Sequence, residues 1–183
     1  MMIRTIVAAI LILLTETVMT TSTHASDALT VGAKAPDFSL PYATKDSIGK
    51  EPLTLSKEVT KGPIVLAFYP ADWSGGCTIE VCTFRDNFTQ LDSLGIRVWG
   101  ISGDYKYSHH EWAKHHNLPF ELLADHDHAV AKAYDSYGAE DLMNKRTIYV
   151  IGSDGRIAYV NAQYKAREPK DFEDLKAALA NLK

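Results

Sequence analysis

One short segment, residues 70–84, constrains the fold of this chain more than any other part of its sequence. It reads P-A-D-W-S-G-G-C-T-I-E-V-C-T-F and follows an apolar, strand-like run at residues 64–69. Two consecutive glycines supply a tight turn, and a helix-compatible run then covers residues 77–94, with another glycine just past its end. A strand, a glycine turn, a cysteine and a helix in this order predict that Cys77 lies in the first turn of a helix.

The predicted position of Cys77 makes this residue a candidate nucleophile. Free N–H groups and the positive end of the helix dipole favour negative charge at a helix start. A thiol there loses its proton more readily, and the thiolate is the reactive form. Cys82 is the second of two cysteines, and an intact helix would hold the two Cα atoms roughly 8–9 Å apart. A disulfide needs Cα atoms within about 7 Å, so the two cysteines can bond only if the helix start unwinds.

The residues around Cys77 resemble the active-site motif of the peroxiredoxin (AhpC/TSA) family, P-x-x-x-[ST]-x-x-C. Pro70 and Ser74 occupy its other fixed positions. The continuation C-T-x-E-x-C-x-F-R-D is similar to the bacterioferritin-comigratory-protein or PrxQ branch, in which a resolving cysteine follows the peroxidatic cysteine by five residues. Ser74 stands where threonine is usual and keeps the hydroxyl, whereas Gly75 stands where this branch usually has proline. The resemblance extends over residues 31–160.

The resemblance implies a thioredoxin-dependent thiol peroxidase that reduces hydrogen peroxide and organic hydroperoxides. Cys77 would attack the hydroperoxide and become a sulfenic acid, and Cys82 would condense with it to give an intrachain disulfide. A thioredoxin-like thiol donor would reduce that disulfide. The resemblance implies no metal, flavin or haem, and the protein is expected to be a monomer or a homodimer.

Four further residues are candidates for the active site by the same resemblance. Arg146 opens the run R-T-I-Y-V-I-G-S-D-G, where the family has its active-site arginine, whose permanent charge and planar donors suit an anionic sulfur. Taken without the resemblance, Arg146 reads as a surface arginine at a strand start. Glu80 would hold this arginine, because a carboxylate acting directly on the thiol would oppose its ionisation. The Ser74 hydroxyl would orient the peroxide and stabilise the departing oxygen, and Pro70 would shield the thiol from water.

The remaining sequence alternates between strand-like and helix-like stretches. Strands are expected at residues 64–69, 96–101, 120–123, 145–151 and 156–161, and helices at residues 77–94, 108–116, 127–134 and 169–182. The last two strands read as a hairpin, and Ser108 and Glu111 have capping-box spacing at a helix start. Residues 36–40 and 52–55 are candidates for short edge strands. This order predicts an α/β, thioredoxin-like fold with a central mixed sheet flanked by helices.

The first 25 residues read as a secretory signal peptide. Arg4 precedes an apolar core at residues 5–14, and Thr23-His24-Ala25 is a small-residue cleavage site. The apolar run is short for a membrane span, although an uncleaved anchor is the alternative. A single arginine and the presence of Glu16 disfavour a transit peptide. The chain is therefore expected to be one domain, residues 26–183, exported to a periplasm or the cell exterior, without stable membrane association after cleavage.

Charge and histidine content bear on possible partners. The net charge is −4 and no basic patch is present, which argues against nucleic-acid binding. Four of the seven histidines lie within residues 109–116, but none of them forms an i, i+4 pair. They are therefore expected to form a solvated face rather than a metal site, with Trp112 and Ala113 facing the core.

Two other functions stay open from the residues alone. The first is a thiol-disulfide oxidoreductase that acts on proteins. The segment W-S-G-G-C compares with the W-C-G-P-C of thioredoxin, but Ser74 replaces the first cysteine and removes the dithiol. The second is a non-catalytic redoxin-like binding module with an inert disulfide, for which Cys77→Ser would leave function intact.

Overall fold

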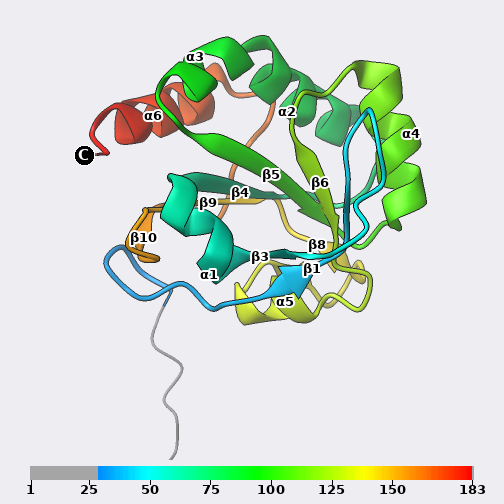
Figure 1. Cartoon of the computed structure of the whole chain (residues 1–183), viewed down its shortest axis with the longest axis horizontal. Coiled ribbons are helices and arrows are strands. Elements are labelled where there is room, and N and C mark those ends of the chain that lie inside the picture. Colours follow the sequence, from blue (N-terminus) through cyan, green and yellow to red (C-terminus); the bar gives the residue numbers. More distant parts are fainter. Residues whose placement is uncertain (1–28, 183) are drawn as a thin grey trace, which may run out of the picture.

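A mixed six-stranded sheet forms the centre of the molecule (Figure 1). The computed structural model describes residues 29–182, and the predicted signal peptide lies outside them. In spatial order the strands are β10 (Ile157–Asn161), β9 (Thr147–Ile151), β4 (Ile64–Phe68), β5 (Arg97–Ser102), β6 (Glu121–Ala124) and β2 (Tyr42–Ala43). The pairs β4–β5 and β5–β6 are parallel and the other three are antiparallel. This sheet confirms the expected thioredoxin-like α/β fold.

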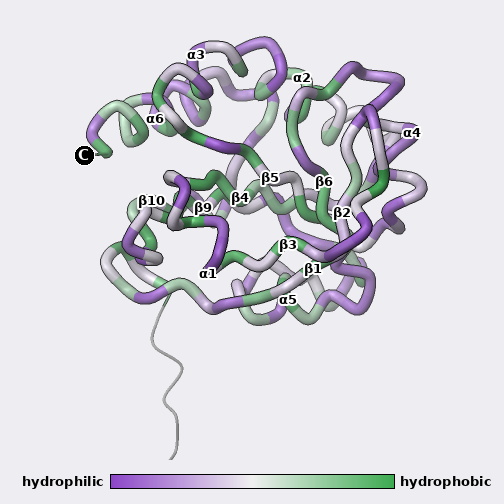
Figure 2. Tube along the Cα trace, viewed as in Figure 1, coloured by the Kyte–Doolittle hydropathy of each residue, from purple (hydrophilic) through white to green (hydrophobic). Residues whose placement is uncertain are grey.

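Helices cover both faces of the sheet (Figure 1). One face packs against α2 (Gly75–Asp86), α3 (Phe88–Ser93), α4 (Lys106–His116) and α6 (Pro169–Ala180), and the other against α1 (Leu55–Glu58) and α5 (Ala129–Ala133). The fully buried β4 divides its side chains between the two cores: Val65 and Ala67 join the α2 side, whereas Leu66 joins the α1 side. Figure 2 shows that β4 is mainly hydrophobic. The two cores hold β4 in a fixed position, and the active-site segment follows directly from its end.

Short elements complete the described chain. They are the ribbons β1 (Ser39–Leu40) with β3 (Leu53–Thr54) and β7 (Tyr137–Gly138) with β8 (Met143–Asn144), and the 3-10 turn η1 (Val59–Lys61). The stretches 36–40 and 52–55 do contain strands, but these pair with each other rather than with the central sheet. The sheet edge is formed instead by β2, a two-residue strand too short to leave a periodic signal. Among the described residues, no helix is long and apolar enough to cross a membrane.

The single helix expected at residues 77–94 is wrong, because the chain forms two helices there. Asn87 separates α2 from α3 with a non-helical backbone (φ −105°, ψ 7°). Its side-chain amide donates to the carbonyl of Thr83 at 2.8 Å, so the side chain competes with the helical main chain. The predicted end is confirmed, since Gly95 follows with a positive φ of 70°.

The capping box expected at Ser108 is also wrong. The helix begins earlier, at Lys106, with Tyr105 as its N-cap residue. The Ser108 hydroxyl donates instead to Asp72 in the loop after β4, at 2.7 Å. Trp112 and Ala113 face the core as expected and are fully buried.

Candidate active site

Cys77 lies in the first turn of α2, as the sequence predicts. β4 ends at Phe68, and an active-site loop, residues 70–74, leads from there into the helix. Ser74 is the N-cap residue with an extended backbone, and its Oγ accepts the N–H of Cys77 at 3.4 Å. Its carbonyl oxygen accepts the N–H of Thr78 at 2.9 Å. The main-chain N–H groups of this first turn are therefore directed towards the end of the helix where the cysteine is held.

Arg146 links the cysteine to a buried carboxylate. Its Nη2 donates to Cys77 Sγ at 3.5 Å, and its Nη1 donates to Glu80 Oε2. Sheet register explains this position, because Phe68 at the end of β4 pairs with Thr147 at the start of β9. Arg146 precedes Thr147 and is thereby brought beside the start of α2. The structure thus brings together Ser74, Cys77, Glu80 and Arg146, although Arg146 lies 69 positions after Cys77 in the chain.

Burial sets the electrostatics of the Glu80–Arg146 pair. The Glu80 side chain is fully buried, which raises its pKa to about 7 against the lowering effect of Arg146. Within the described chain its second oxygen, Oε1, has no hydrogen-bond partner. Burial lowers the pKa of Arg146, but Glu80 and Cys77 outweigh that effect and the net change is upward. The guanidinium therefore stays positively charged next to the sulfur.

A hollow opens beside the guanidinium. It has a volume of about 360 Å³ and is lined by Gly76, Arg146, Tyr164, Lys165, Ala166, Arg167 and Glu168. Tyr164 is buried, donates its N–H to the Arg146 carbonyl at 3.2 Å, and has its pKa raised by burial and by Glu80. Sequence reasoning missed Tyr164, which follows the last strand and belongs to no motif.

Cys82 lies on the same unbroken helix and is half-buried. Both cysteines are free thiols within the wound α2 helix. Burial raises the pKa of Cys82, with Arg85 opposing and Asp86 adding to the effect. Its Sγ lies 4.0 Å from Nδ1 of His116, whose pKa is lowered by burial, by His115 and by Arg85.

The expected solvated histidine face is only partly right. His115 is exposed and lies against the ring of Trp73, with ring centroids 5.5 Å apart. His109, however, is fully buried and hydrogen-bonded to Asp72, because it points into the core below the active-site loop. Within residues 29–182, no group of three or more potential ligand side chains comes together to hold a metal. Pro70 is half-buried at the start of the loop, and its shielding role stays a prediction.

The fold and this site define a thioredoxin-like protein with a buried thiol held at a helix start beside an arginine. The model of the AhpC/TSA family matches residues 31–160, and the chain belongs to that family. Its relatives further show a peroxiredoxin of the PrxQ/Bcp-like branch, a thiol peroxidase.

Three relatives and one solved structure illustrate the match. Peroxiredoxin Q, chloroplastic, of Sedum lineare is 39% identical over 148 residues, which are 78% of this chain and 75% of that protein. Peroxiredoxin Bcp of Bacillus subtilis is 37% identical over 134 residues, 69% of this chain and 81% of that one. The crystal structure of peroxidoxin BcpB from Mycobacterium tuberculosis aligns with a TM-score of 0.73 and 27% identity, covering 85% of this chain and 99% of that chain. The match spans only 60% of the chloroplastic peroxiredoxin Q of Triticum aestivum.

Proposed function

We propose that Cys77 is the peroxidatic cysteine and Cys82 the resolving cysteine of an intrachain cycle that reduces hydrogen peroxide and organic hydroperoxides. The observation that supports this most directly is the 3.5 Å contact between Arg146 Nη2 and Cys77 Sγ at the start of α2. A fixed cation beside a helix N-terminus favours the thiolate, which is the form that attacks an O–O bond.

In the first step the thiolate of Cys77 attacks the terminal oxygen of the hydroperoxide. The S–O bond forms as the O–O bond breaks, and the departing oxygen leaves as an alkoxide or hydroxide that takes up a proton. Cys77 becomes a sulfenic acid. Arg146 and the Ser74 hydroxyl, which both contact Cys77, would stabilise the charge on the departing oxygen. The hollow beside Arg146 offers room for the organic part of a hydroperoxide.

In the second step the sulfur of Cys82 attacks the sulfenic sulfur of Cys77. A disulfide forms, and the hydroxyl of the sulfenic acid leaves as water with the proton of the Cys82 thiol. Because both cysteines lie on α2, this step requires the helix start to unwind. A thioredoxin-like dithiol then reduces the disulfide and is itself oxidised.

The test compares the reduced wild type with Cys77→Ser and Cys82→Ser, each mixed with hydrogen peroxide. The wild type should consume peroxide and form an intrachain disulfide, whereas Cys82→Ser should accumulate a sulfenic acid that a carbon nucleophile traps at Cys77, detectable by mass spectrometry. Cys77→Ser should show no fast reaction. Peroxide consumption by Cys77→Ser at the wild-type rate would refute the proposal. Dithiol exchange with protein disulfides without peroxide consumption would favour the oxidoreductase alternative instead.

We also propose that residues 1–25 are removed during export to a periplasm or the cell exterior. The hypothesis depends on the charged, apolar and small-residue order of this segment. Intact-mass analysis of the protein from its native host should give a chain that begins at Ser26. A full-length mass would contradict it.

A further inference from the structure

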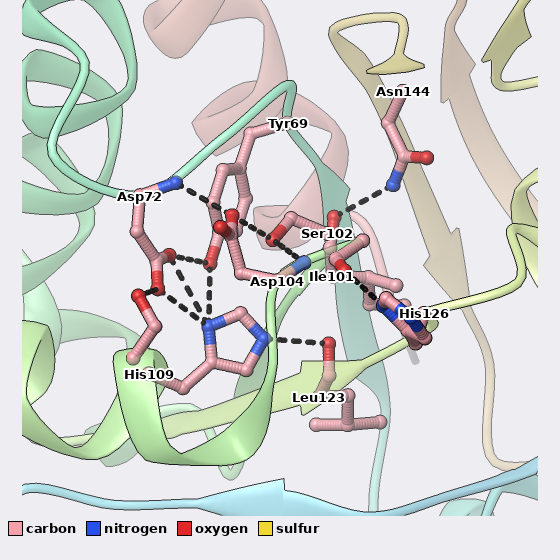
Figure 3. Close-up of polar contacts among 11 residues, drawn as sticks. Tyr69, Asp72, Ile101, Ser102, Asp104, His109, Leu123, His126 and Asn144 are labelled. Atoms are coloured by element: carbon pink, nitrogen blue, oxygen red, sulfur yellow. Dashed lines mark hydrogen bonds and ion pairs between the residues drawn. The ribbon is translucent and has the colours of Figure 1, made fainter. Parts of the chain in front are cut away.

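A cluster of buried polar side chains lies beneath the active-site loop and is used by no step of the proposed chemistry (Figure 3). Tyr69 follows β4 directly, Asp72 lies in the middle of the loop, and His109 lies on α4. Tyr69 and His109 are fully buried, and Asp72 is 7% exposed. Burying three such groups is unfavourable unless their hydrogen bonds are satisfied, so their partners reveal what the cluster does.

Both carboxyl oxygens and the main-chain N–H of Asp72 have partners in this cluster. The Tyr69 hydroxyl donates to its Oδ1 at 2.9 Å, and the Ser108 hydroxyl donates to its Oδ2 at 2.7 Å. His109 Nδ1 lies 3.2 Å from Oδ1 and 3.0 Å from Oδ2. The main-chain N–H of Asp72 donates to Asp104 Oδ2 at 2.8 Å. The loop is therefore held by β4, by α4 and by the segment after β5.

The same contacts fix where the protons of His109 lie. Its Nε2 is 3.1 Å from the carbonyl oxygen of Leu123, which can only accept, so Nε2 carries a hydrogen. Its Nδ1 faces the Asp72 carboxyl group, whose two oxygens already accept a hydroxyl hydrogen. The Tyr69 hydroxyl also lies 3.4 Å from Nδ1, but its hydrogen is donated to Asp72, so a hydrogen shared between Nδ1 and the Asp72 carboxyl group satisfies this contact. The His109 ring is therefore hydrogen-bonded at both nitrogens, to Asp72 and to Leu123.

The neighbouring groups agree with this assignment. The charged or titratable members of the cluster are Tyr69, Asp72, Asp104 and His109. The pKa of Tyr69 is raised by its burial, then by Asp72, so the phenol keeps its proton and donates it. Asp104 Oδ2 also accepts the Ser102 hydroxyl at 2.8 Å. Asp104 is linked to the cluster through the main-chain N–H of Asp72, and His109 closes the cluster on its α4 side.

We propose that Asp72 and His109 form a buried hydrogen-bonded pair that positions the active-site loop for peroxide reduction. Asp72 stands between Pro70 and Ser74, so holding it fixes the residues proposed to shield the thiol and to orient the peroxide. This inference rests on the proposed role of Cys77. The anchors on α4 and beyond β5 do not belong to α2, so the loop keeps its place when the cysteine helix unwinds. The chain would then change direction, between the held loop and the unwound helix, at Trp73, which has a positive φ of 60°.

The first test needs no substitution. Nitrogen-detected NMR of the imidazole rings in the reduced wild type should show His109 Nε2 carrying a hydrogen that exchanges slowly with solvent, because it is donated to the buried Leu123 carbonyl. A bare Nε2, or an Nε2 hydrogen that exchanges as fast as those of exposed histidines, would overturn this buried hydrogen-bonded arrangement. This result does not depend on whether Cys77 reacts with peroxide.

The second test measures the two chemical steps separately in His109→Gln and Asp72→Asn. The rate constant for oxidation of Cys77 by hydrogen peroxide should fall by roughly tenfold or more, because a small misplacement of positioning groups has large kinetic effects. The rate of the following disulfide formation should be unchanged. A general loosening of the fold would instead accelerate that second step, and this outcome, or a wild-type peroxide rate, would refute a positioning role.

Two further variants distinguish a loss of loop positioning from a failure to fold. His110→Gln changes the adjacent ring on α4, which contacts Thr44 rather than the loop, and should behave as wild type. If His109→Gln does not fold, Ser108→Ala removes a single donor to Asp72 and should give a smaller loss in the same step. A wild type that fails to react at Cys77 would refute the proposed function, whereas a reactive wild type with unaffected variants would refute only this inference.

Discussion

Cys82 Sγ lies 4.0 Å from His116 Nδ1, so α4 supplies an acceptor for the second thiol while α2 is wound. Burial raises the pKa of this thiol and lowers the pKa of this imidazole. At neutral pH the sulfur therefore keeps its hydrogen and the ring is free to accept it. The contact favours the wound helix, which is the proposed peroxide-reactive state, over the unwound helix that the proposed disulfide requires.

Replacing His116 with alanine should accelerate disulfide formation by roughly twofold to fivefold, because a weak buried hydrogen bond contributes up to about 1 kcal/mol. Oxidation of Cys77 should keep its rate. Tryptophan fluorescence after rapid mixing with peroxide should resolve the two phases. His115→Ala, which removes the exposed neighbouring ring, is the matched control. A slower second phase in His116→Ala would show that His116 assists the attack as a base.

Substitution by alanine should have different effects at Gly75 and at Gly76, the two glycines at the start of α2. A Cβ at Gly76 would lie 3.1 Å from Arg146 Nη2 and displace the guanidinium, so Gly76→Ala should slow the peroxide step by roughly tenfold. A Cβ at Gly75 would meet nothing within 4 Å. Gly75→Ala should therefore stabilise α2 by up to about 1 kcal/mol and slow only disulfide formation. Stopped-flow kinetics on both variants, together with thermal unfolding, distinguishes these effects, and equal behaviour of the two variants would contradict this account.

Glu80 should make stability depend on pH in a particular direction. Its pKa is raised from 4.5 to about 7 on folding, so the folded state binds this proton more tightly than the unfolded state. The contribution of protonated Glu80 to the free energy of unfolding is fully present below about pH 4.5 and is lost as the pH rises to about 7. Glu80→Gln cannot titrate, so the decline in the free energy of unfolding across this window should flatten, by roughly 3 kcal/mol at most. Urea unfolding at a series of pH values measures this, with the exposed Glu140→Gln as control; identical slopes in wild type and Glu80→Gln would rule it out.

Ser74 caps α2 and has a proposed chemical role as well, and two substitutions separate the two. Ser74→Ala removes the acceptor for the Cys77 N–H, and should lower the free energy of unfolding by about 1 kcal/mol and slow peroxide reduction. Ser74→Thr retains the hydroxyl and should restore most of both properties. Chemical denaturation and peroxide kinetics provide the two measurements. If Ser74→Ala reacted with peroxide as fast as wild type, the hydroxyl would have no part in orienting the substrate.

The local pattern around the first cysteine was sufficient to predict its place in the fold. A buried strand, two glycines and a helix put Cys77 in a first helical turn, and the structure confirms that arrangement. The position of Arg146 could not be predicted in this way, because its sequence spacing alone indicated a surface residue. Its approach to the sulfur depends on the antiparallel register of β4 and β9, which is a long-range property that only the family resemblance anticipated.

The errors have local physical causes. Periodicity suggested one helix through residue 94, but the side chain of Asn87 competes for a carbonyl and interrupts it. Ser108 has the spacing of a helix cap, yet its hydroxyl is taken by Asp72, 36 positions earlier in the chain. The burial of His109 follows from that same tertiary contact. Polar residues whose partners are distant in sequence carry no periodic signal, so their roles become visible only in three dimensions.

The interruption at Asn87 limits how much of the protein the catalytic cycle disturbs. α2 spans 12 residues and includes both cysteines, whereas α3 begins just beyond the break and keeps Leu91 in the core. Fraying that starts at the cysteine therefore meets a natural stopping point before it reaches the packing of α3 on the sheet. In the proposed cycle, the cooperative unit that opens in each turnover is one short helix, and the remaining core can stay folded while the two sulfurs form and lose their bond.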